Sequence, residues 1–331
     1  MKRKILILSN EEEGAVELVT KHLRTMGESF FRFNTDTFPQ NKTLTTTLSN
    51  GKILGSLTNL NQDTHNNVLI DSENIKSVWY RRPAPPKIRK GVREDLREFC
   101  WNESRATLWS FYTTIDAFWV NPPLLAVKLL EDNKLYQLKG AQIIGLNVPQ
   151  TIISNNFEDI LSFSSNHKYM AIKPLYTTVF RKKNKDLLFL YTNRITQKEI
   201  LDKKEELALC PIMLQEYINK KVELRITIVG NNIFACAIHS QDSNQTLHDW
   251  RRYSSSGVKH EQYELPNCIK LELLKLMNMF GLFYAAIDMI ITPDEKYVFL
   301  EINPSGQWGW IEKLTGMKIS QAIAKLLAQP S

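Results

Sequence analysis

Two apolar segments of the chain, residues 284–291 and 297–303, each contain an acidic residue where a buried strand rarely has one. A short polar turn with a proline joins them, which predicts a β-hairpin. Asp288 interrupts the first segment and Glu301 the second. Because side chains alternate along a strand, Asn303 shares the face of Glu301. A fold that includes this hairpin must therefore accommodate two carboxylates and an amide among Ile, Leu and Phe side chains.

The register of the hairpin decides whether its two acids meet. A turn over residues 293–296 pairs Thr292 with Tyr297 and sets Asp288 opposite Glu301. Like charges that face each other on a sheet destabilise it, so this pair needs compensation. Mg²⁺ takes hard oxygen ligands of this kind together with water and phosphate. The residue types by themselves leave two interpretations, a magnesium site or a solvent-facing hairpin with ordinary acids.

The composition predicts a globular, cytoplasmic protein. Its 331 residues predict about two domains, and 43% hydrophobic residues are enough for a large core. Four scattered cysteines form no Cys-x-x-Cys pair, and no apolar run reaches the roughly 18 residues of a membrane span. The net charge of +7 suits nucleic acid, an anionic membrane, a nucleotide or an acidic peptide. The 13 glycines are few, which disfavours a phosphate site built on a long glycine loop.

The N-terminal part has the pattern of a Rossmann-type βαβ unit without a Gly-x-Gly-x-x-Gly turn. Residues 4–8 predict a buried strand. Ser9 and Asn10 predict a helix N-cap with the acids 11–13 in the first helical turn, and a second strand follows over 30–33. Beyond it we expect exposed hairpins over 43–67, a strand over 75–80 and a long helix over 93–119.

The Asn-Pro-Pro break at 121–123 predicts a domain boundary. After it we expect helices over 124–144, 157–163 and 196–207, strands over 151–153 and 169–174, and a hairpin through 181–186. A strand-rich part follows, with strands over 212–217, 223–229 and 233–240 and a helix over 266–280.

Polar residues recur in this second half in a distinctive order. Lys173 ends an apolar strand, Gln215-Glu216 ends another, Glu223-x-Arg225 begins a third, and His248-Asp249-Trp250-Arg251 comes later. Taken singly, each is explained as a strand-end lysine, an edge-strand acid or a solvated loop. Taken in this order, and followed by Asp288 and the Glu-x-Asn-Pro motif at 301–304, they resemble the ATP-grasp ligases over residues 134–312.

The resemblance implies an α/β (α+β) ATP-grasp fold. An N-terminal Rossmann-like pre-grasp domain over 1–122 would precede two α/β subdomains, 123–210 and 211–331, that clasp ATP. Carried over by position, the ATP phosphates would be contacted by Lys134 and Lys173. Adenine would be held by the backbone near Gln215, Glu216, Tyr217 and Ile218, with Glu216 and Glu223 beside the adenine and ribose. The γ-phosphate and an acyl phosphate would be neutralised by Arg225 and Arg251, and Mg²⁺ would be held by Asp288, Glu301 and Asn303.

Two further motifs narrow the resemblance to the peptide macrocyclases of the microviridin or graspetide family. These are Val78-Trp79-Tyr80-Arg81-Arg82-Pro83 and the segment 300–308, which reads Leu-Glu-Ile-Asn-Pro-Ser-Gly-Gln-Trp. One departure is that residues 176–184, where many ATP-grasp enzymes have a glycine-rich phosphate lid, contain no glycine. Thr177, Thr178 and the basic residues that follow are the candidate lid contacts.

This resemblance implies an ADP-forming ligase that activates Glu or Asp side chains of a ribosomally made precursor peptide as acyl phosphates. Thr or Ser hydroxyls, or Lys amines, would then close ester or amide rings. It also implies a homodimer. The alternative is a RimK-like amino-acid ligase of the same fold that acts on a protein or peptide C-terminus. We expect neither a membrane nor a nucleic-acid partner, because no basic-aromatic ladder, helix-turn-helix or RNP motif is present.

The hairpin over 178–192 and the helix after it are our candidates for the surface that binds the leader segment of the precursor. The alternative is a solvated, lysine-rich hairpin. The residues expected to contact the peptide are Arg181, Lys182, Lys183, Asp249, Trp250 and Arg251.

Overall fold

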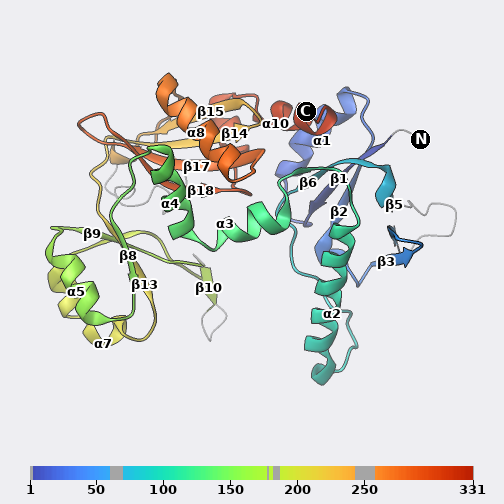
Figure 1. Ribbon diagram of the computed structural model, residues 1–331, viewed down its shortest axis with the longest axis horizontal. Helices are drawn as coiled ribbons and strands as arrows, with labels where there is room; N and C mark the ends of the chain where they lie inside the picture. Colours follow the sequence, from blue (N-terminus) through green and yellow to red (C-terminus); the bar gives the residue numbers. More distant parts are fainter. Residues whose placement is uncertain (1–2, 60–69, 177–178, 182–186, 243–257, 331) are drawn as a thin grey trace. The chain divides into compact units, whose positions relative to one another are not determined.

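The computed structural model describes residues 3–59, 70–176, 179–181, 187–242 and 258–330 (Figure 1). Contacts divide the chain into two compact units. The first consists of Met1–Pro123, Gln307–Glu312 and Lys318–Ser331, and the second of Leu124–Gly306 and Lys313–Met317. None of the helices in the described ranges is long and apolar enough to cross a membrane.

The first unit is built on a parallel sheet, which confirms the Rossmann-like pattern. Its strands lie in the order β2-β1-β6-β7, with bounds Phe30–Asn34, Lys4–Ser9, Ile75–Tyr80 and Phe118–Val120. Ile5 to Leu8 are fully buried, as expected for a central parallel strand. Helix α1 (Ala15–Thr25) packs against α10 (Ile319–Ala328), so the end of the chain returns to this unit. The three-part domain division stays a prediction.

Two predictions in this unit are wrong in detail. Helix α2 spans only Glu94–Thr113, because residues 118–120 pair with β6 as an edge strand instead of continuing the helix. Helix α1 begins at Ala15, so the acids at 11–13 precede it rather than filling its first turn. Of the exposed hairpins expected over 43–67, the structure shows the one formed by β3 (Lys42–Ser49) and β4 (Lys52–Asn59), and β4 also pairs with β5 (Ile70–Asp71). Residues 60–67 lie outside the described residues. Short 3₁₀ turns lie at Thr35–Thr37 and Ser72–Asn74.

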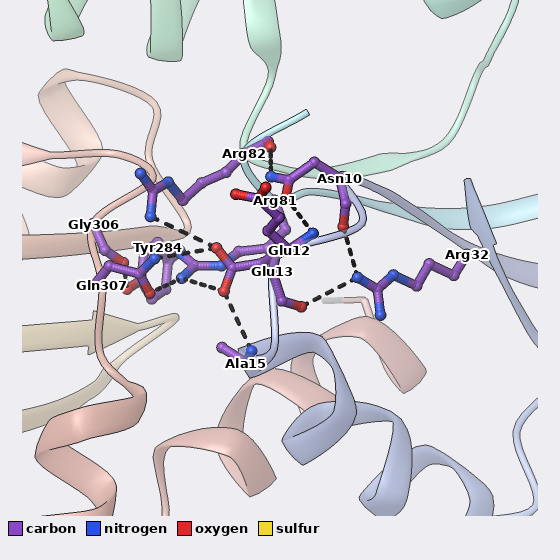
Figure 2. A network of polar contacts seen from close by, with 10 residues as sticks. All are labelled: Asn10, Glu12, Glu13, Ala15, Arg32, Arg81, Arg82, Tyr284, Gly306 and Gln307. Carbon is purple, nitrogen blue, oxygen red and sulfur yellow. Dashed lines mark hydrogen bonds and ion pairs between the residues drawn. The ribbon is translucent and has the colours of Figure 1, made fainter. Parts of the chain in front are cut away.

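Glu13 lies outside the helix because it is the acceptor of a buried polar network in the first unit (Figure 2). Its carboxylate accepts from the Arg81 guanidinium at 3.3 Å, from the Gln307 amide at 3.1 Å and from the Ala15 backbone N–H at 3.3 Å. Arg81 in turn donates to the Gln307 side-chain oxygen at 2.6 Å. Arg81 and Glu13 are almost fully buried, so each charge is compensated by the other.

The smaller sheet of the second unit is antiparallel, with strand order β12-β9-β13-β8. The strands span Asn193–Ile195, Met170–Lys173, Ile212–Glu216 and Thr151–Ser154. Helices α5 (Phe157–Ser165), α6 (Gln197–Leu201) and α7 (Lys204–Leu207) bury Ile160, Ile200 and Leu207 against it. The single helix expected over 196–207 is therefore two helices. The neighbouring hairpin pairs β10 (Val179–Arg181) with β11 (Leu187–Phe189).

The larger sheet of the second unit has the order β16-β15-β14-β17-β18 and is also antiparallel. Its strands span His260–Gln262, Asn232–Ile238, Val222–Val229, Tyr284–Ile291 and Tyr297–Asn303, with a 3₁₀ turn at Ser240–Asp242. Helices α8 (Asn267–Met279) and α4 (Lys134–Ile144) pack together, and α4 packs against β18. The helix expected over 124–144 is instead a π-helical segment Pro123–Lys128, α3 (Leu129–Glu131) and α4, because Asn133 caps a new helix start. Helix α9 spans Gly309–Thr315.

The β17–β18 hairpin pairs the two acids as predicted, but its register near the turn differs from the expected one. Ile291, not Thr292, lies opposite Tyr297, so the register near the turn is one residue away from the expected one. The register shifts between Asp288 and Met289, which leaves Leu300 as an extra residue in β18. Asp288 consequently lies opposite Glu301, as predicted.

Candidate active site

The second unit contains a pocket lined by strands of both its sheets. Strands β9 and β13 contribute from the smaller sheet, and β14, β17 and β18 from the larger one. Among the residues predicted from the sequence, the pocket brings together Lys134, Lys173, Gln215, Glu216, Tyr217, Ile218, Glu223, Asp288 and Glu301. Its lining also includes Tyr176, Thr192, Lys220, Leu300, Met289 and Ile290, which the sequence analysis did not single out.

Arg225 and Asp288 form the central ion pair of the larger sheet. They are cross-strand neighbours on β14 and β17, and the Arg225 Nη1 donates to both Asp288 carboxylate oxygens at 2.9 and 2.8 Å. The exposed fractions of the two side chains are only 9% and 18%. Burial by itself would lower the pKa of the Arg225 guanidinium, but Asp288, with smaller contributions from Tyr284 and Glu301, leaves that pKa raised. Arg225 is therefore a fixed positive charge.

Glu301 has its own cation, which comes from a different element. Lys134 is the first residue of α4, and its Nζ donates to Glu301 at 2.9 Å. Gln137, one turn further along α4, donates to the Leu130 carbonyl at 2.7 Å and accepts from the Ile302 backbone N–H at 3.0 Å. These bonds hold the start of α4 against β18, which is why two residues 167 positions apart can pair.

The predicted metal ligands do converge. Asn303 donates to Glu301 at 3.3 Å, and Glu301 lies opposite Asp288. The compensation that the facing acids require is supplied here by Arg225 and Lys134. In the described part of the chain, no group of three or more His, Cys, Asp or Glu side chains is arranged to hold a metal ion. The set available for Mg²⁺ is thus two carboxylates and one amide, which fits an ion that keeps water and phosphate ligands.

Leu300 owes its place in the pocket to the bulge in β18. A regular strand would alternate Phe299, which is fully buried in the core, with a residue facing the pocket. The extra residue instead brings Leu300 and Glu301, which are adjacent in the chain, to the same pocket. Bulges commonly redirect side chains near active sites. The apolar pattern of 297–303 gives no signal of it.

Glu223 lies at the start of β14 and is held by two groups that sequence reasoning missed. Its Oε1 accepts from Lys220 Nζ and from Ser240 Oγ, both at 2.6 Å. The Lys220 side chain is only 5% exposed. The sequence analysis did not single out Lys220, and only the tertiary contacts reveal this buried ion pair.

The strand end at 215–218 forms one wall of the pocket. Gln215 is buried and donates to Thr151 Oγ1 at 2.9 Å, while its side-chain oxygen is buried without a hydrogen-bond partner among the described residues. The Glu216 backbone N–H donates to the Gln150 carbonyl at 2.8 Å. Burial raises the pKa of the Tyr217 phenol, and nearby Glu223 raises it further against the opposing effect of Arg194. Because the Gln215 side-chain oxygen lacks a partner in the part of the chain that the structure describes and Gln215 lines the pocket, this oxygen can accept a hydrogen bond from a ligand.

The residues predicted to contact a peptide are not tested by this geometry. Arg181 lies in β10, whose backbone pairs with β11. Lys182, Lys183, Asp249, Trp250 and Arg251 lie outside the described residues. Their roles stay predictions.

Comparison with known proteins identifies the family of the chain. Residues 4–125 match the MvdD pre-ATP grasp domain, and residues 124–327 match the RimK-like ATP-grasp domain. The chain belongs to the ATP-grasp ligases. The expected fold and the resemblance to peptide macrocyclases are both confirmed.

Two similar solved structures match this ATP-grasp ligase over almost its whole length. The macrocyclase MdnC bound with precursor peptide MdnA, from Microcystis aeruginosa MRC, is 35% identical with a TM-score of 0.86, covering 99% of this chain and 100% of that one. A RiPP-associated ATP-grasp ligase of Chryseobacterium gregarium, in complex with ADP and a leader and core peptide, is 30% identical with a TM-score of 0.89, covering 99% and 97%.

A curated relative is more distant. Tetrahydromethanopterin:alpha-L-glutamate ligase of Methanocaldococcus jannaschii is 23% identical over 205 residues, which are 60% of this chain and 66% of that relative. The chain thus spans about two thirds of that ligase.

Proposed function

We propose that this ATP-grasp ligase closes rings in a ribosomally made precursor peptide. It joins a Glu or Asp side-chain carboxyl group to a Thr or Ser hydroxyl as an ester, or to a Lys amine as an amide. The observation that carries the proposal is the similarity over the full length of the chain to a macrocyclase solved with its precursor peptide. The pocket supports it, because several cations lie beside a pair of acids.

The chemistry proceeds in two transfers. A carboxylate oxygen of the peptide attacks the γ-phosphorus of ATP, the bond to the β-phosphate oxygen breaks, and ADP leaves. The hydroxyl or amine then attacks the acyl carbon, phosphate leaves with the bonding electron pair, and the proton of the nucleophile passes to solvent or to phosphate. Each ring removes one water from the peptide. The protein contributes mainly positioning and charge neutralisation.

Several groups of this chain serve the nucleotide. Lys134 and Lys173 neutralise its phosphates, with Arg225 and Arg251 at the γ-phosphate and the acyl phosphate. The strand end 215–218 holds adenine, which the unpartnered Gln215 oxygen supports, since an exocyclic amino group is a donor for it. Asp288, Glu301 and Asn303 would hold Mg²⁺, which supplies charge neutralisation between the phosphates. When these acids serve the ion, the positive charges of Arg225 and Lys134 are available to phosphate as well.

The RimK-like family match and the glutamate ligase relative favour a second candidate, the addition of an amino acid to a peptide or protein C-terminus. Mass spectrometry distinguishes the two reactions. The enzyme is incubated with MgATP and a short acidic, Thr-rich candidate precursor peptide. We expect loss of one water mass per ring. A gain equal to an amino-acid residue would support the alternative, and an unchanged mass would refute macrocyclisation of that peptide.

The peptide-binding surface is proposed at the β10–β11 hairpin and the helix that follows it. Reversal of the charges of Arg181, Lys182 and Lys183 should reduce retention of the precursor on immobilised enzyme. Because tethering raises the effective concentration of the reacting segment, the same variant should also slow cyclisation. Unchanged retention would exclude this role. We also propose a homodimer, which light scattering of the purified chain tests directly.

A further inference from the structure

Gly306 lies where the chain leaves β18 and folds back over the sheet face that carries Arg225. Its backbone N–H donates to the Asn303 carbonyl at 3.1 Å, which closes a tight turn. Its carbonyl accepts from the Tyr284 hydroxyl at 2.6 Å (Figure 2). Tyr284 begins β17 and is buried, so the turn is anchored to the same strand that carries Asp288.

Space, not backbone conformation, explains the glycine at this position. The φ angle of Gly306 lies outside the left-handed region that favours glycine. A Cβ atom built on it would lie 2.5 Å from the Ala286 Cβ, 3.0 Å from the Arg225 Nη2 and 3.1 Å from the Asn303 Cβ. The first distance is shorter than real Cβ contacts allow, and at the second the guanidinium would have to give by a few tenths of an ångström.

We propose that Gly306 is a positioning residue for Arg225. The missing side chain leaves the room in which Nη2 lies while Nη1 remains on Asp288, and the Tyr284 hydroxyl keeps the turn at that distance. A side chain at 306 pushes the guanidinium out of this arrangement. The inference rests on the proposed function, in which Arg225 neutralises the γ-phosphate. It adds a residue that touches neither nucleotide nor peptide.

The test measures binding of two nucleotides and so needs no peptide. MgADP and the non-hydrolysable analogue MgAMP-PNP differ at the γ-phosphate, so the ratio of their dissociation constants reports the contacts made to that group. For Gly306→Ala we expect the preference for MgAMP-PNP to fall about tenfold, the size of one lost hydrogen bond to a charged group, with MgADP affinity unchanged. Gly309→Ala is the matched control, because a Cβ there meets only ordinary contacts at 3.6 and 3.7 Å.

A second substitution separates the contact with Arg225 from the contact with Ala286. Ala286→Gly removes the atom nearest to the new Cβ but leaves its 3.0 Å approach to the Arg225 Nη2, so Gly306→Ala/Ala286→Gly should keep the lowered preference for MgAMP-PNP, and recovery of the preference would overturn the inference. A crystal structure of Gly306→Ala should show the guanidinium moved from its 2.8–2.9 Å contacts with Asp288. An unmoved guanidinium, or an unchanged nucleotide ratio in folded Gly306→Ala, overturns the inference.

Arg225→Gln distinguishes failure of the inference from failure of the function on which it rests. If Arg225→Gln lowers the ratio and Gly306→Ala does not, Gly306 has no positioning role and the role of Arg225 stands. If Arg225→Gln leaves the ratio unchanged, the γ-phosphate role of Arg225 is wrong and the positioning role falls with it. Loss of ring closure in Arg225→Gln alone would then point to a later step.

Discussion

At the scale of single residues, this site is organised by two ion pairs that cross between elements. Asp288 faces Arg225 and Glu301 faces Lys134, each with an N–O distance below 3 Å. Buried ion pairs add little net stability, but loss of one partner leaves an uncompensated charge. The pairs therefore hold these acids and cations in fixed positions.

Asp288→Asn tests this directly. The substitution keeps the shape of the side chain and removes the charge that faces buried Arg225, so we expect the second unit to lose about 3 kcal/mol of stability. Mg²⁺-dependent nucleotide binding should weaken as well. Urea unfolding monitored by hydrogen exchange in β14 and β17 measures the first effect. Glu295→Gln is the matched control, because its partner Lys221 and Glu295 itself are exposed, and we expect a loss below about 1 kcal/mol.

At the scale of elements, the bulge in β18 adds one residue to an otherwise alternating strand. Phe299 faces the core and Glu301 the pocket, with Leu300 inserted between them. Without Leu300, Glu301 would follow Phe299 directly and the regular register would still place it opposite Asp288. The bulge thus serves the pocket wall rather than the acid pair.

Deletion of Leu300 should consequently spare the fold and weaken the nucleotide site. We expect a protein that unfolds cooperatively near the wild-type temperature, with MgADP affinity reduced about tenfold by the loss of an apolar wall contact. Calorimetric titration with MgADP gives the affinity. Wild-type affinity in the deletion variant would show that Leu300 does not contact the nucleotide.

At the scale of the whole molecule, the C-terminal residues belong to the first unit although they follow the site in sequence. Gln307 joins Glu13 and Arg81 there (Figure 2). Helix α10 packs on α1. The Trp-Tyr-Arg-Arg-Pro motif therefore has a structural use. Its first arginine is 1% exposed and holds the loop after β1.

Glu13→Gln tests the importance of this network. Arg81 would keep a hydrogen-bond acceptor but lose its buried counter-charge, so we expect the first unit to be destabilised by about 3 kcal/mol. Hydrogen exchange of β1 and β6 should become faster, while MgADP binding in the second unit persists. Glu12→Gln, at an exposed neighbouring position, should leave exchange unchanged. Equal protection in both variants would show that the buried pair does not support the sheet.

The amino-acid sequence predicted the ATP-grasp fold, the parallel sheet of the first unit and about half of the pocket lining. The pattern of apolar residues predicts the strand at Ile5–Leu8 and the strands β17 and β18. The order of the motifs indicates the family. The position of Asp288 opposite Glu301 follows from the hairpin predicted between their strands. These features depend on local patterns or on residues within one hairpin.

The partners of the site residues are known from the tertiary structure alone. It revealed Lys134 on Glu301, Lys220 on Glu223, the bulge at Leu300, and Glu13 outside its helix with Arg81 and Gln307. Such contacts join residues far apart in the chain or depend on one extra residue in a strand. Many acidic and basic residues are equivalent in their local sequence. Which of them pair depends on burial and charge compensation, and these are set only when the helices and strands pack together.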